Sequence, residues 1–277
     1  METTDIIGIV FVVLGIIFYL ALGTRLYRSY KVSDKKQTLY LSLLLLFGGL
    51  ALLLLTLEQL VLLVNADPLD SQTIDDAISI FQYSDIDVFW VGFLFASLAW
   101  ITSGLAIVSA NFFTQSFFPD SNKKLLLIPI LLITAYLILI ISSPFYFEYN
   151  GSDWSPNHDA STTFILWILF LVPLWTVSFL FLYLSISLKR KGTPAWRRVA
   201  WFFLSQVILS IGFTIEVLSP NSFTTFFDSI GLTTELLLNE SLWSISARFM
   251  IMIYAVLMWI AVYTPNWAKG WLGASKS

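Results

Sequence analysis

The chain has 277 residues, of which 57% are hydrophobic and only 12% are charged, whereas a soluble domain carries roughly a quarter charged residues. This composition excludes an ordinary water-soluble protein, and with a net charge of −3 we expect no nucleic-acid partner. The sequence contains no cysteine, which excludes disulfides, thiolate metal sites and cysteine nucleophiles.

Continuous apolar runs predict seven membrane-spanning helices. About 20 apolar residues are needed to cross roughly 30 Å of hydrocarbon, and lipid offers no partner for open backbone groups, so each span is expected to be helical. The predicted spans, in chain order, are residues 6–28, 38–64, 86–114, 124–142, 162–188, 197–218 and 243–264. The predicted fold class is therefore an all-α bundle of seven transmembrane helices, with residues 1–277 forming one integral membrane domain.

The distribution of basic residues predicts the orientation of this bundle. Of the 15 Lys and Arg residues, all except Arg248 lie in the first, third and fifth connections or after the last span. If seven helices alternate in direction, these segments share one side of the membrane, and an excess of Lys and Arg marks the cytoplasmic side. We therefore expect a multi-pass protein of the cell membrane with an extracellular N-terminus and a cytoplasmic C-terminus.

Charged residues within the predicted spans are candidate site residues. Glu58 and Gln59 lie near the outer end of the second span, Glu216 at the outer end of the sixth, and Arg248 about five residues into the seventh. A charge near the bilayer centre costs about 2.5–3.5 kcal/mol on insertion scales. Three interpretations of Arg248 follow: it extends outward to lipid phosphates, it forms an ion pair with Glu58 or Glu216, or it lines an outward-facing pocket opposite Glu58 and Gln59.

The sixth span carries a second candidate feature. Gln206, Ser210 and Thr214 recur every four residues, a spacing that places them near one face of a helix. In a membrane bundle such a polar face either hydrogen-bonds to a neighbouring helix or lines a polar cavity.

The residues that known intramembrane chemistry requires are missing from the predicted spans. The one histidine, His158, lies in a polar connection, so neither a zinc protease motif nor paired haem ligands can form. No predicted span carries a lysine away from its cytoplasmic end, which argues against a retinal Schiff base. We therefore expect no cofactor, no metal site and no enzymatic activity.

Two segments resemble a known family. "LKRKGTPAWRRVAWFFLSQVILSIGFTIEVLS", a basic connection leading into the sixth span, and "MIYAVLMWIAVYTPNW" in the seventh are similar to seven-helix input regions of prokaryotic membrane histidine kinases. The resemblance implies a sensor module. No kinase domain follows the seventh span here, so the resemblance implies output through a separate protein.

The leading functional prediction is a non-enzymatic, receptor-like or sensory protein that contacts the lipid bilayer and a cytoplasmic partner at its basic inner loops. Two alternatives stay open: a small-solute transporter or channel that uses the polar face of the sixth span, and a structural subunit of a membrane complex.

Overall fold

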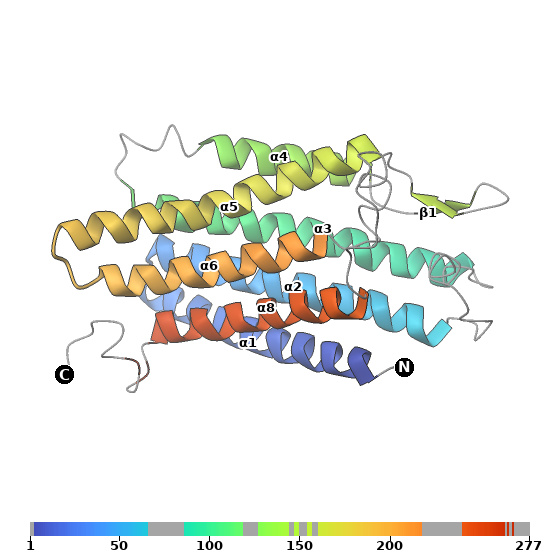
Figure 1. The fold of residues 1–277 in the computed structure, drawn as a ribbon, viewed down its shortest axis with the longest axis horizontal. Coiled ribbons are helices and arrows are strands. Elements are labelled where there is room, and N and C mark those ends of the chain that lie inside the picture. Colours follow the sequence, from blue (N-terminus) through green and yellow to red (C-terminus); the bar gives the residue numbers. More distant parts are fainter. Residues whose placement is uncertain are drawn as a thin grey trace.

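A computed structural model shows seven helices in the part of the chain that it describes (Figure 1). The structure describes residues 3–65, 86–118, 127–143, 147–149, 154–156, 160–217 and 240–263, together with Pro265 and Ala268. The helices are α1 (Thr3–Ser33), α2 (Lys36–Asn65), α3 (Ile86–Gln115), α4 (Leu127–Ser142), α5 (Ala160–Arg190), α6 (Trp196–Val217) and α8 (Glu240–Tyr263).

The helical fold predicted from the apolar runs is confirmed. Six of the helices are long and apolar enough to cross a membrane, which gives the chain the character of a multi-pass membrane protein. The exception is α4, whose 16 described residues rise about 24 Å, less than the roughly 30 Å of a hydrocarbon core. The predicted span 124–142 begins in residues that the structure does not describe, so a seventh crossing stays a prediction.

A small sheet departs from the all-α prediction. Strands β1 (Phe147–Tyr149) and β2 (Trp154–Pro156) pair antiparallel, with Glu148 opposite Ser155. The sequence predicts only a connection here, since each strand has three residues, fewer than the five or six of an average strand, and leaves little pattern to detect.

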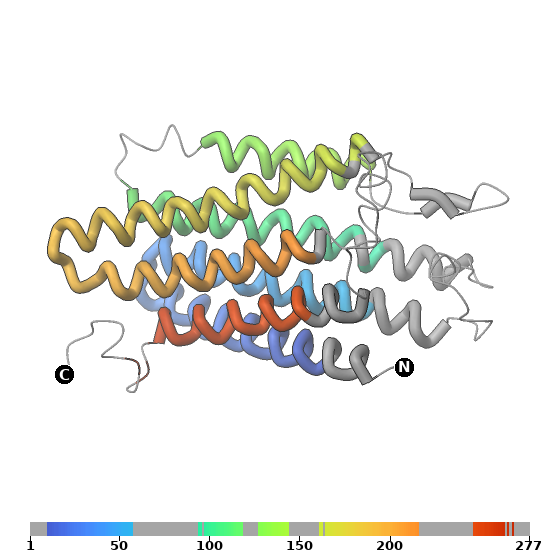
Figure 2. The backbone as a smooth tube through the Cα atoms, viewed as in Figure 1, coloured from blue at the N-terminus to red at the C-terminus, as the bar shows by residue number. Residues whose placement is uncertain are grey.

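The helices run side by side along the long axis of the molecule (Figure 2). Helix α1 packs against α2 and α8, helix α3 against α2, α4 and α5, and helix α6 against α5 and α8. Buried apolar side chains from all seven helices form one continuous core that includes Tyr19, Leu45, Tyr136, Phe181 and Met258.

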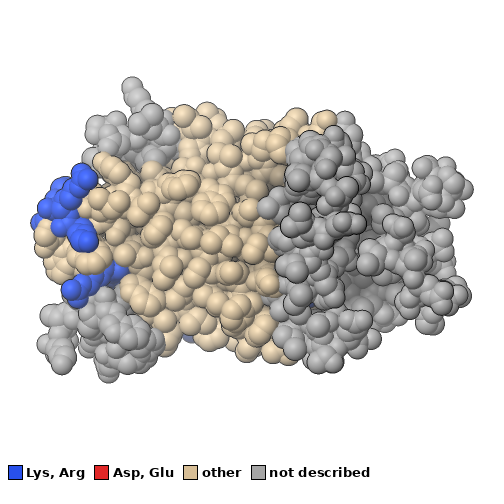
Figure 3. Space-filling model, in the orientation of Figure 1, with Lys and Arg blue, Asp and Glu red and all other residues tan. Residues whose placement is uncertain are grey.

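Basic side chains gather at one end of the described bundle (Figure 3). Figure 1 places both the α1–α2 and the α5–α6 connections at this end, which we call the basic end. The α1–α2 connection consists of two residues, Asp34 and Lys35, and Asp34 adopts a left-handed backbone with φ of 51°. The prediction that the basic end faces the cytoplasm rests on the charge pattern alone.

Helix α5 ends at the basic end in a Schellman motif. The Thr193 amide donates to the Leu188 carbonyl at 3.1 Å, and the Gly192 amide donates to the Lys189 carbonyl at 3.0 Å. Gly192 takes a φ of 68°, which glycine adopts without the steric cost of a Cβ atom. This turn reverses the chain, so α6 returns alongside α5.

Candidate functional site

A cavity lies inside the bundle, lined by side chains from α1, α2, α3, α5, α6 and α8. Its volume is about 80 Å³, several times the space that one water molecule needs and about half of the ~150 Å³ engineered cavity that binds benzene. The space is therefore large enough for a few waters or for a small organic group. We call it the central cavity.

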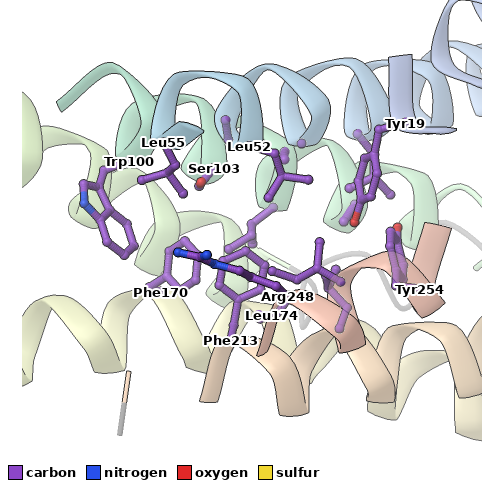
Figure 4. Close-up of a pocket in the computed structure, with 18 of the residues that line it drawn as sticks. Tyr19, Leu52, Leu55, Trp100, Ser103, Phe170, Leu174, Phe213, Arg248 and Tyr254 are labelled. Carbon is purple, nitrogen blue, oxygen red and sulfur yellow. The ribbon is translucent and has the colours of Figure 1, made fainter. Parts of the chain in front are cut away.

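Arg248 extends from α8 into the central cavity, as Figure 4 shows. Its side chain is half-buried, and Leu55 and Thr56 of α2 line the same space. Helices α2 and α8 thus face each other across the cavity, while α1 packs against both. The structure therefore places Arg248 facing inward.

Most of the cavity wall is apolar. Phe170 packs with its ring centroid 6.1 Å from that of Trp100 and 5.3 Å from that of Phe213, joining α3, α5 and α6. Leu52 and Leu174 complete this part of the wall (Figure 4). Such a wall favours an apolar ligand body, because most small-molecule sites combine apolar walls with a few placed polar groups.

The polar groups opposite this wall come from three helices. Gln206 of α6 is 1% exposed, and its Nε2 donates to Tyr254 Oη of α8 at 3.1 Å. Gln206 Oε1 is buried and has no hydrogen-bond partner in the described part of the chain. The ring of Tyr19 from α1 lies 5.5 Å from that of Tyr254, and both tyrosines line the cavity. We call Tyr19, Gln206 and Tyr254 the polar cluster.

The other two residues of the predicted polar face bind α5. Ser210 Oγ lies 3.1 Å from Ser178 Oγ, and Thr214 Oγ1 accepts a hydrogen bond from Trp175 Nε1 at 3.1 Å. A four-residue step turns a helix by about 40° beyond a full turn, so the three side chains drift around α6. Because of this rotation, Gln206 faces the cavity, whereas Ser210 and Thr214 face α5 and hydrogen-bond to it.

Aromatic rings close the cavity toward the basic end. One or two turns beyond the lining residues Ala110, Leu174 and Gln206, the rings of Phe113, Phe181 and Phe202 pack with centroid distances of 5.7–5.8 Å. All three rings are buried. Among the described residues, these rings therefore fill the space between α3, α5 and α6 on this side of the central cavity.

Helices α6 and α8 stay joined from the polar cluster to the basic end. Nearer the basic end than the Gln206–Tyr254 hydrogen bond, Ser205 Oγ lies 3.1 Å from Met258 Sδ. At the end of α8, Arg198 donates from Nε to the Ala261 carbonyl and from a terminal nitrogen to the Val262 carbonyl, both at 2.7 Å. These bonds satisfy carbonyls that a helix end leaves without partners.

Helix α1 reaches the same end of α8. The Arg25 guanidinium lies 4.3 Å from the centre of the Tyr263 ring, a cation–π contact. Helices α1, α6 and α8 thus meet both at the polar cluster and at the basic end.

The structure places three other sequence-based candidates by their backbone, Glu58 and Gln59 in α2 and Glu216 in α6. Their side chains are not among those described, so an ion pair between Arg248 and either acid stays a prediction. Among the residues that the structure does describe, no three His, Cys, Asp or Glu side chains lie close enough to hold a metal ion.

Tyr19 and Tyr254 were missed in the sequence analysis. Each lies inside an apolar helix, where a tyrosine is indistinguishable from a packing residue unless its neighbours are known. Their distance from the helix ends was the available signal, because tyrosines of membrane helices concentrate at the interfaces.

No family model matches the chain, and the search of curated proteins finds no significant match. The resemblance to histidine-kinase input regions therefore stays a prediction.

Proposed function

We propose that the protein is a non-enzymatic, receptor-like membrane protein that binds a small ligand in the central cavity and signals to a separate protein at the basic end. The observation that carries this proposal is the cavity itself, which joins an inward-facing Arg248 and a buried polar cluster to an apolar wall. Convergent polar groups in an apolar pocket are the usual form of a small-molecule site.

The contacts between α6 and α8 support a route for the signal. A ligand shifts a conformational equilibrium only when it binds one arrangement better than the other. Gln206 and Tyr254 hold the two helices together at the cavity, and Arg198 holds them together at the basic end. A ligand that changes the contact at the cavity would therefore change how α6 and α8 sit near the α5–α6 connection.

Transport is the less favoured function because two observations argue against a continuous polar path. Ser210 and Thr214 are engaged with α5, and the rings of Phe113, Phe181 and Phe202 fill the space toward the basic end.

The chain offers a clean background for a test, because its lack of cysteine allows pairs of labels to be introduced. Small molecules that raise the unfolding temperature of the purified protein would first be selected. Spin labels at Lys35→Cys and Lys191→Cys, both exposed residues at the basic end, would then report the distance between the two connections. We expect a stabilising molecule to shift this distance distribution.

A cavity-filling variant supplies the control. Ala106 lines the cavity, so Ala106→Leu should remove both the stabilisation and the distance shift, while Ala21→Leu, at an exposed position of α1, should keep both. A molecule that binds in the cavity but leaves the distance distribution unchanged would contradict signalling. Its uptake by liposomes containing the protein would instead favour transport.

A further inference from the structure

We infer that the polar cluster binds the hydroxyl group of an uncharged alcohol, with the apolar part of the molecule against Leu52, Leu174 and Phe170. This inference rests on the proposed function, because it assigns the chemical class of the cavity's ligand. The juxtaposition behind it is a buried carboxamide, whose oxygen accepts no hydrogen bond from the described residues, at the edge of an apolar cavity.

The unused atom defines what the ligand must supply. Gln206 Oε1 is buried, accepts no hydrogen bond from the described residues, and belongs to a side chain that lines the cavity. Buried polar side-chain atoms in native proteins nearly always have a partner. A ligand hydroxyl in this corner would donate to Oε1 and replace the missing partner.

A hydroxyl group also fits the cluster in either orientation of the amide. With Nε2 donating to Tyr254 Oη, the ligand must donate to Oε1. With the amide turned over, Tyr254 would donate to Oε1 and the ligand would have to accept from Nε2. A hydroxyl group both donates and accepts, whereas an ether only accepts and an ammonium group only donates. An alcohol is thus satisfied in both cases. An ether is excluded only when Oε1 faces the ligand, which is the orientation that the Nε2 bond to Tyr254 sets and that the competition below tests.

The surroundings favour an uncharged group. The charged Arg248 precedes Tyr254 by six residues on α8, or about 9 Å along the helix axis. Its side chain extends away from Tyr254, so the guanidinium group lies toward the other end of the cavity (Figure 4). Around the polar cluster, the lining residues Leu44, Ala110 and Leu209 are apolar. An ion placed there would lose its hydration without gaining an opposite charge.

The size of the cavity points to short alcohols as probes. A volume of about 80 Å³ is near half that of the ~150 Å³ engineered cavity that binds benzene. Three molecules with five non-hydrogen atoms form a matched set: 1-butanol donates and accepts hydrogen bonds, diethyl ether only accepts them, and n-pentane does neither. The photoreactive diazirine alcohol 3-azibutanol serves as the label.

The experiment labels the full-length protein in detergent with 3-azibutanol and maps the labelled residues by mass spectrometry. Each competitor is then titrated against labelling of the cavity residues. We expect label on lining residues such as Tyr254, and 1-butanol competing about fivefold better than diethyl ether, which is the worth of one neutral hydrogen bond. In Gln206→Met, which keeps the unbranched shape without the amide, this ratio should fall to about one.

Ser210→Ala is the matched control, because Ser210 lies one turn along α6 and binds Ser178 instead of the cavity. It should keep the wild-type ratio. Comparing ratios between variants in the same micelles cancels the partitioning of each competitor into detergent.

The outcomes separate the two proposals. Equal competition by 1-butanol and diethyl ether in the wild-type protein overturns the hydroxyl assignment but leaves a ligand-binding cavity. Absence of label from every cavity residue overturns the alcohol assignment, whereas the ligand-binding cavity itself is overturned if no stabilising molecule loses its effect in Ala106→Leu. If Gln206→Met does not fold, the ratio of 1-butanol to diethyl ether competition in the wild-type protein, corrected for the partitioning of each competitor into protein-free micelles, still decides the hydroxyl question.

Discussion

The contact between Gly48 of α2 and Tyr19 of α1 allows a sharp test of the helix packing beside the cavity. A Cβ atom at position 48 would lie 2.8 Å from Tyr19 Cε1 and 3.1 Å from Cδ1, whereas ordinary contacts begin at 3.4 Å. The Tyr19 ring is only 3% exposed and packs on Tyr254, so it can yield only by tilting toward the central cavity that it lines. Gly48→Ala should therefore force α1 and α2 apart or tilt the ring.

The magnitude follows from two opposing contributions. Overpacking of a filled core costs about 1–3 kcal/mol, and replacing a helical glycine by alanine returns roughly 0.5–1 kcal/mol. We expect a net loss of about 1–2 kcal/mol for Gly48→Ala. Gly15→Ala, in the same α1–α2 interface, meets its nearest atom, Leu52 Cδ1, at an ordinary 3.7 Å. It should raise the free energy of unfolding by roughly 0.5–1 kcal/mol.

The assay is thermal unfolding of both variants in one detergent, followed by circular dichroism. A difference of about 2 kcal/mol between them corresponds to roughly 4–8 °C for a chain of this size. If Gly48→Ala is as stable as Gly15→Ala, the register of α1 against α2 at Tyr19 is wrong. Loss of 3-azibutanol labelling in Gly48→Ala alone would further tie Tyr19 to the shape of the cavity.

Three further predictions concern charge and backbone. Arg198→Met should lower the free energy of unfolding by about 2 kcal/mol, because two charge-assisted bonds to α8 carbonyls are lost, whereas Lys191→Met should stay within about 0.5 kcal/mol in the same denaturation assay. Gly192→Ala should cost about 1–2 kcal/mol through its φ of 68° alone, since no atom lies within 4 Å of the added Cβ; an unchanged unfolding temperature would refute the left-handed turn. If Glu58 pairs with Arg248, which is one of the interpretations that the sequence leaves open, the double variant Glu58→Gln, Arg248→Gln should be damaged less than the two single variants together, and simple additivity would exclude the pair.

The helix positions were predictable because the membrane imposes a length and a backbone conformation on any apolar run. The third predicted span, 86–114, corresponds to α3 at Ile86–Gln115, and the fifth, 162–188, to α5 at Ala160–Arg190. Helix α4 shows the limit of this logic, since its described part is shorter than a membrane crossing. The β1–β2 hairpin was not predictable, because three-residue strands carry no periodic signal.

The candidate site was predictable only in part, for geometric reasons. Arg248 stood out because a charge in an apolar run is costly wherever it points. The spacing of Gln206, Ser210 and Thr214 indicated a shared face, but that face turns by about 40° per step, and which part of it meets α5 depends on how α6 is rotated in the bundle. Tyr19 and Tyr254 belong to helices distant in sequence, so their meeting could not be anticipated.

The sequence by itself thus determined the helical membrane character, the segregation of basic residues toward alternate connections and the presence of an intramembrane charge. These properties follow from composition and spacing along one chain. The tertiary structure alone decided that Gln206, Tyr19 and Tyr254 converge, that α2 faces α8 across a cavity, and that Arg198 binds the end of α8. Such contacts depend on the relative rotation and depth of packed helices, and these are fixed by the fit of many side chains at once.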